Sequence, residues 1–92
     1  MLKQMFMAVT SLVALATLIG SAYAADPGFC RDYARAAVRE FEIAHSIPGC
    51  VGYDLRWHPG YVQHFQWCLG ASYEAAATER EARRARLRAC GA

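Results

Sequence analysis

The sequence predicts an all-α domain: an antiparallel two-helix hairpin held by two disulfides and preceded by a cleavable signal peptide. Three observations support this fold class. An apolar N-terminal segment ends in a cleavage motif, and four cysteines lie at positions 30, 50, 68 and 90. Two segments rich in helix-forming residues flank a loop that contains proline and glycine. Together these features indicate an exported protein whose small fold depends on crosslinks.

The signal peptide is predicted over residues 1–24. Lys3 supplies the basic start, residues 6–19 are mostly apolar, and Ala22-Tyr23-Ala24 has the small-x-small form that signal peptidase accepts. An uncleaved membrane anchor is the alternative, because the apolar stretch approaches the ~20 residues that span a bilayer. The cleavage motif favours removal after Ala24 and a periplasmic or secreted product.

The predicted mature domain, residues 25–92, is small and nearly neutral. A chain of this size buries only about 60% of its unfolded surface, so its apolar contacts need covalent support. Four cysteines in an oxidising compartment therefore predict two disulfides rather than a metal site. Nine arginines face eight acidic residues in this range, a balance that argues against a nucleic-acid partner.

The first helix is predicted to begin at Asp26-Pro27, a typical N-cap and first-turn pair. Apolar residues then follow the helical spacing, and Arg31, Arg35, Arg39, Glu40 and Glu42 are assigned to the opposite side. The stripe comprises Cys30, Tyr33, Ala34, Ala37, Val38, Phe41 and Ala44. The segment 46–52 is predicted to end the helix, because it contains a proline and two glycines.

The second helix is predicted to begin at His58-Pro59 and to continue to Cys90. No proline follows this pair, and the segment is rich in Ala, Arg, Glu and Leu, which favour helix. Only Gly70 argues against one unbroken helix. Glu79 and Arg83 are expected to form an ion pair one turn apart near the surface.

The disulfide pairing follows from these helices. On an unbroken helix Cys68 and Cys90 lie about 33 Å apart, too far for a disulfide. Two pairings remain: Cys30–Cys90 with Cys50–Cys68, or Cys30–Cys68 with Cys50–Cys90. The antiparallel hairpin favours the first, nested pairing, because it places one bridge near the loop and the other at the open end.

Three runs of the chain, residues 30–34, 57–68 and 84–90, resemble small exported bacterial proteins with four cysteines on a helical hairpin. This resemblance implies an architecture and an envelope location and carries no activity. Mitochondrial twin-cysteine hairpins share the layout, but their cysteines follow CX9C or CX3C spacing. The wider cysteine spacing of this chain disfavours that family.

No catalytic residue, metal or cofactor is predicted. The chain has no CxxC pair for thiol exchange, and Ser72 lacks the sequence context of a hydrolase nucleophile. His64 and Cys68 have a spacing that suits two metal ligands on one helix face. We expect Cys68 to be oxidised instead, with His64 packed beside the aromatic side chains.

Two groups of residues are the candidates for partner contact: the aromatic side chains Trp57, Tyr61 and Trp67, and the arginines Arg80, Arg83, Arg84, Arg86 and Arg88. Packing in the core is the favoured interpretation for Trp57. Trp67 lies away from the cysteine stripe, and both core packing and an exposed role are open for it. These features predict a non-enzymatic interaction or structural module whose partner is a protein or an anionic envelope component. The alternative is a membrane-active or anionic-surface-binding peptide that uses the arginine-rich helix.

Overall fold

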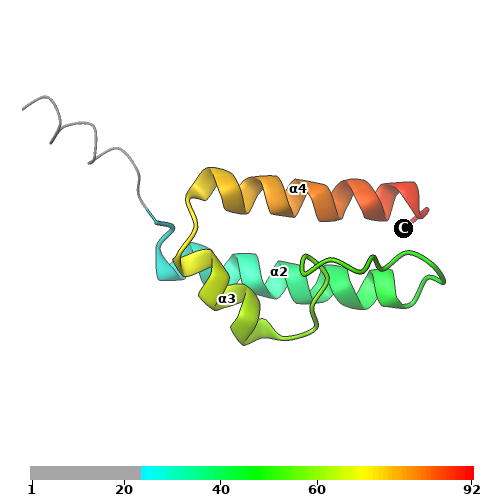
Figure 1. Cartoon of the computed structure of the whole chain (residues 1–92), viewed down its shortest axis with the longest axis horizontal. Helices are drawn as coiled ribbons and strands as arrows, with labels where there is room; N and C mark the ends of the chain where they lie inside the picture. The colour runs from blue at the N-terminus through cyan, green and yellow to red at the C-terminus, as the bar shows by residue number, and fades with distance from the viewer. Residues whose placement is uncertain (1–23) are drawn as a thin grey trace, which may run out of the picture.

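The computed structural model describes residues 24–92, which form three helices: α2 (Pro27–His45), α3 (Tyr61–Leu69) and α4 (Tyr73–Ala89) (Figure 1). The all-helical fold class and the two disulfides are confirmed. The predicted signal peptide lies outside the described residues, apart from Ala24. Among the helices described here, none combines the length and the apolar character needed to cross a membrane.

Helix α2 begins and ends where the sequence predicts. Oδ1 of Asp26 accepts a hydrogen bond of 2.8 Å from the backbone N–H of Phe29, which caps the first turn. Pro27 occupies the first helical position, where a missing N–H costs nothing. The helix ends at His45, and Gly49 has a φ of +78°, a turn conformation that glycine adopts without strain.

The prediction of one unbroken second helix is wrong, because the chain forms two helices separated at Gly70–Ser72. The Oγ atom of Ser72 accepts a hydrogen bond of 3.0 Å from the backbone N–H of Ala75, and this bond begins a new helix. The start is also displaced from the predicted one: α3 begins at Tyr61, and Nδ1 of His58 accepts the N–H of Gly60 instead.

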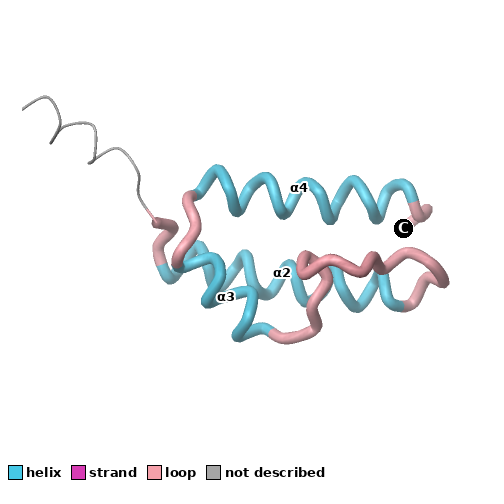
Figure 2. Tube along the Cα trace, in the orientation of Figure 1, coloured by secondary structure: helices cyan, strands magenta, loops and turns pink. Residues whose placement is uncertain are grey.

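This break changes the direction of the chain. Helix α3 runs antiparallel to α2, and after the turn α4 runs alongside α2 in the same direction (Figures 1 and 2). Tyr73 at the start of α4 accordingly contacts Asp26 at the start of α2 through a hydrogen bond of 2.7 Å. The two long helices are therefore parallel rather than an antiparallel hairpin, and three helices replace the predicted two.

The disulfide pairing differs from the predicted one for the same reason. The structure joins Cys30 to Cys68, with Cα atoms 5.5 Å apart, and Cys50 to Cys90, with Cα atoms 5.9 Å apart. The predicted pairs, Cys30–Cys90 and Cys50–Cys68, are wrong. The end of α3 returns to the start of α2, while α4 carries Cys90 to the far end, where Cys50 lies.

Each disulfide lies within its own small hydrophobic cluster. The first cluster contains Ala25, Cys30, Tyr33, Cys68 and Ala76, and the second contains Ala44, Cys50, Trp57 and Leu87. The buried Ala25 also donates its backbone N–H to the carbonyl of Ala71 at 2.8 Å, which ties the segment before α2 to the α3–α4 turn. The middle of the helix assembly, between the two clusters, contains the buried polar side chains of Glu40, His64 and Arg83.

Candidate functional site

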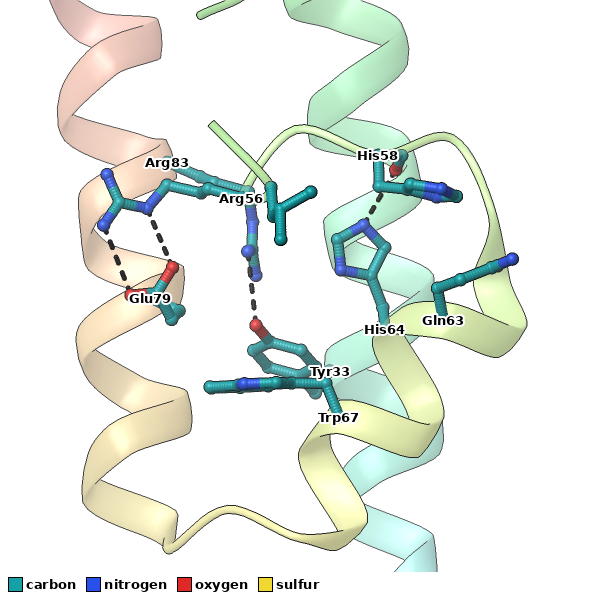
Figure 3. Close-up of a pocket in the computed structure, with 9 residues that line it drawn as sticks. Tyr33, Arg56, His58, Gln63, His64, Trp67, Glu79 and Arg83 are labelled. Atoms are coloured by element: carbon teal, nitrogen blue, oxygen red, sulfur yellow. Dashed lines mark hydrogen bonds and ion pairs between the residues drawn. The ribbon is translucent and has the colours of Figure 1, made fainter. Parts of the chain in front are cut away.

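A cleft of about 520 Å³ opens in this middle region, between the three helices and the loop 46–60 (Figure 3). Its volume falls in the range of small-molecule sites, roughly 300 to 1,000 Å³. Helices contribute Tyr33, Gln63, His64, Trp67, Glu79 and Arg83. The loop contributes Leu55, Arg56 and His58.

Arg83 of α4 is the central polar residue of the cleft, and only 1% of it is exposed. Its Nε atom donates to Oε1 of Glu40 at 2.8 Å, and its Nη1 atom donates to the hydroxyl of Tyr33 at 3.2 Å. The guanidinium carbon lies 4.9 Å from the centre of the Tyr33 ring, within cation–π distance. Nη2 is buried and has no hydrogen-bond partner.

Glu40 of α2 compensates the buried charge of Arg83. A buried guanidinium is costly unless it is paired and hydrogen-bonded. The second carboxylate oxygen of Glu40 lies 3.6 Å from Nε of the more exposed Arg84, so that one carboxylate serves two arginines of α4. Tyr33 shares this buried site, and burial raises the pKa of its hydroxyl.

A second ion pair links the loop to α4. Arg56 donates to Glu79 through Nε at 2.8 Å and through Nη2 at 3.2 Å, a two-point arrangement that fixes the orientation of both groups. The hydrogen bond from Arg56 holds the pKa of Glu79 below its usual value. This pair, visible in Figure 3, positions the loop residues that line the cleft.

His64 of α3 is buried in the cleft wall as a neutral imidazole. Its Nε2 atom lies 2.7 Å from the backbone carbonyl of His58. Because a carbonyl can only accept, Nε2 carries the proton, and Nδ1 is left as an acceptor in the neutral ring. Burial lowers the pKa of His64 from its usual 6.5. Its ring meets those of Tyr33 and His58 edge to face.

The structure separates the three aromatic candidates. Trp67 lines the cleft with 44% of its surface exposed, and its ring centre lies 5.6 Å from that of Tyr33. Trp57 is only 9% exposed and packs in the cluster of the second disulfide, as favoured from the sequence. Tyr61 stacks on Phe65 at 5.8 Å and is not among the lining residues.

The arginine candidates make contacts within the domain. Arg86 donates to the backbone carbonyls of Cys50 and Gly49 at 2.8 and 2.9 Å, which fastens the end of α4 to the loop. Arg88 pairs with Glu81 at 2.8 Å, and both side chains are exposed. Arg80 lies over the rings of Phe29 and Tyr33, and Arg84 lies beside Glu40 as described above.

Two expectations about charged residues need correction. Glu79 and Arg83 do not pair with one another, because each has a partner from another segment: Arg56 for Glu79 and Glu40 for Arg83. Glu40 was assigned to the polar side of the first helix, but it is buried. It follows Tyr33 by seven residues, two helical turns, and this spacing was the available signal that it shares the inner face.

The histidine–cysteine metal site is not formed, since Cys68 is bonded to Cys30. Within residues 24–92, no cluster of three or more His, Cys, Asp or Glu side chains is arranged to hold a metal ion. Comparisons with protein-family models, with curated proteins and with solved structures find no match for this chain. The cleft itself offers means of recognition: an arginine donor, an imidazole acceptor and an open indole face.

Proposed function

We propose that the protein is a non-enzymatic binding module that acts in the periplasm or outside the cell, after removal of residues 1–24. The cleft between α2, α3, α4 and the loop is its recognition site. One observation carries this proposal: Trp67, 44% exposed, forms a wall of a cleft whose floor holds the buried Arg83. Tryptophan and arginine side chains in such settings dominate the affinity of many binding sites.

The covalent framework supports the same function. The two disulfides lie on either side of the cleft along α2, at Cys30 and at Cys50 just beyond its end. They restrict the movement of α3 and α4 relative to α2, so that a partner meets a preformed surface and little affinity is lost in ordering it. Two disulfides also favour an oxidising compartment, in agreement with the predicted export.

The alternative, an anionic-surface-binding peptide, has weaker support. Arg83 is buried against Glu40, and Arg86 is bonded to two backbone carbonyls. Arg83 is therefore buried out of reach of an anionic surface, and Arg86 is engaged within the domain. Attraction through the remaining exposed arginines is expected to fade as the Debye length falls from ~8 Å at physiological salt to ~3 Å at 1 M, whereas contact in the cleft is expected to persist.

Site-specific photocrosslinking in cells of the native host tests the proposal. A photoreactive aromatic amino acid, which keeps an apolar ring in the cleft, replaces Trp67, and in a matched variant it replaces Ala77, which is exposed on α4 and does not line the cleft. We expect a discrete adduct from position 67 and none from position 77. The same adducts from both positions, or no adduct from a correctly oxidised protein, would contradict a recognition role of the cleft.

Intact-mass spectrometry of protein isolated from the native host tests the export. We expect the mass of residues 25–92 less four hydrogens, which corresponds to cleavage after Ala24 and two disulfides. A mass that includes residues 1–24, or labelling of all four thiols without reduction, would contradict this part of the proposal.

A further inference from the structure

We propose that the cleft binds a carboxylate ligand with an aromatic or apolar body, and that the carboxylate is held by Arg83. This inference rests on the proposed function, because it takes the cleft to be the recognition site. It adds the chemical class of the occupant. The same chemistry is presented by a free organic acid and by the C-terminus of a polypeptide.

Arg83 has a hydrogen-bond donor that no group of the protein satisfies. A guanidinium carries five N–H groups and no acceptor. In Arg83, Nε bonds to Glu40 and Nη1 bonds to Tyr33, but the buried Nη2 has no partner among the protein groups. Buried polar groups almost always have a partner, and an unmet one costs ~1 to 3 kcal/mol. An oxygen acceptor entering the cleft would remove this cost.

The guanidinium of Arg83 is held in a fixed orientation. Glu40 and the Tyr33 hydroxyl fix two sides of the Arg83 guanidinium, and the Tyr33 ring supports its face. Figure 3 shows the group held between α4 and Tyr33. A ligand therefore meets a donor that is already positioned, and carboxylate is, with phosphate, an acceptor whose geometry a guanidinium matches. Glu40 and Glu79 balance the charges of Arg83 and Arg56, so recognition of a carboxylate depends on the unpaired Nη2 donor of Arg83.

Trp67 and Leu55 offer apolar surface to the body of the ligand. The Trp67 indole lies beside the ring of Tyr33 with its plane tilted by 31°, and 44% of the residue is exposed, so part of its apolar surface is available for contact. Leu55 lines the same cleft with 90% of its surface exposed, so little packing opposes its movement when a ligand enters. An aromatic or apolar group can cover Trp67 and Leu55 while its carboxylate reaches Arg83.

The test compares an acid with its neutral amide on the oxidised wild-type protein, residues 25–92. The probes are 3-phenylpropionate and 3-phenylpropionamide, followed by NMR of the ¹⁵N-labelled backbone and arginine Nε groups. We expect saturable shifts at Trp67 and at Nε of Arg83, with the acid binding at least about tenfold more tightly than the amide. Equal affinities, no saturable binding, or shifts confined to exposed arginines such as Arg39 would overturn the proposal.

Variants locate the binding. Trp67→Ala is expected to weaken the acid about tenfold or more, whereas Arg88→Gln, outside the cleft, is expected to leave its affinity unchanged. Arg83→Gln is expected to abolish the preference for acid over amide. If this variant does not fold, the ratio of acid to amide affinity in the wild-type protein and the Trp67→Ala result still decide whether the cleft binds a carboxylate ligand. An unchanged affinity in Trp67→Ala would overturn the assignment of the body to this wall.

A further comparison identifies the source of the carboxylate. A short peptide that ends in phenylalanine is tested with a free and with an amidated C-terminus. Tighter binding of the free peptide than of 3-phenylpropionate would indicate a polypeptide terminus, and weaker binding would indicate a free acid. If crosslinking from position 67 succeeds but acid is not preferred over amide, the carboxylate inference fails and the proposed function stands.

Discussion

Nε of Arg83 on α4 donates to Oε1 of Glu40 on α2 at 2.8 Å, and both residues are buried. This bond joins two helices that run in the same direction, in the region between the two disulfide clusters. A misplaced α4 would leave two buried charges without partners, which is far more costly than a lost apolar contact. The pair therefore contributes to the register of α4 against α2 as well as to the floor of the cleft.

Loss of the Glu40 carboxylate is expected to destabilise the domain strongly. Glu40→Ala leaves the Arg83 charge buried without its partner, and removing one member of such a pair typically costs ~3 to 5 kcal/mol. Denaturant unfolding with the disulfides intact measures the change. Glu42→Ala, an exposed position on the same helix, is the control and is expected to change the unfolding free energy by less than about 0.5 kcal/mol.

The double variant Glu40→Leu, Arg83→Met is expected to recover much of the stability lost in Glu40→Ala, because it buries no unpaired charge. Equal stability of Glu40→Ala and Glu42→Ala would show that the buried pair has no structural role.

The interleaved disulfides predict a specific peptide map. Trypsin cleaves after arginine, and without reduction we expect residues 25–31 joined to 57–80, and residues 40–56 joined to 89–92. The nested pairing would instead join 25–31 to 89–92 and 40–56 to 57–80. Mass spectrometry distinguishes these products directly, and recovery of the nested set would refute the arrangement of α3 and α4.

Stability is expected to fall in mildly acidic solution because of His64. Burial lowers the pKa of His64 in the folded state below 6.5, so that the unfolded chain takes up the proton first as the pH falls. The stability that neutral His64 contributes is complete above about pH 6.5. As the pH falls from there toward the pKa of the folded state, the unfolding free energy decreases by at most ~1.4 kcal/mol per pH unit.

Unfolding free energies at pH 7.5 and pH 5.5 measure this dependence. His64→Gln is expected to reduce it, and Gln66→Ala, which replaces a non-titrating side chain at an exposed position of the same helix, is expected to leave it unchanged. An identical pH dependence in the wild-type protein and His64→Gln would contradict the buried neutral imidazole.

Ser72 is expected to be important for the start of α4. Ser72→Ala removes the hydrogen bond to the N–H of Ala75 and is expected to lower the unfolding free energy by about 1 kcal/mol. Ser72→Asp retains an acceptor and is expected to stay within about 0.5 kcal/mol of the wild-type protein. Thermal or urea unfolding compares the two. If Ser72→Ala were as stable as Ser72→Asp, the cap would not determine where α4 begins.

The sequence was sufficient to predict the first helix and the presence of crosslinks. Asp26-Pro27 and the segment after His45 carry strong local signals, and these signals agree with the structure. The second half could not be predicted in the same way. Ala, Arg and Glu favour helix after Gly70, and Gln and Leu favour it before Gly70. The break depends on Ser72 and on the packing of α3 against α2. The nested disulfide pairing depends on an unbroken second helix. Because the turn at Gly70–Ser72 reverses the direction of the chain, the cysteines form the other pairing.

The cleft was harder to predict than the fold. The seven-residue spacing of Tyr33 and Glu40 was a readable sign of a buried carboxylate. The Arg56–Glu79 pair joins residues from a loop and a distant helix, and no local pattern relates them. The position of Trp67 away from the cysteine stripe left both core packing and exposure open, and its place beside Tyr33 depends on how α3 folds back on α2.

The docking of Ala25 against the α3–α4 turn determines how the domain can be attached to other molecules. A group fused directly before this residue must leave through the corner where Ala25 is packed and its N–H is bonded to Ala71. Ala92 is exposed beside the far end of α2 (Figure 1). Affinity tags, fluorophores and surface tethers are therefore best placed at the C-terminus, where they leave the first disulfide cluster undisturbed.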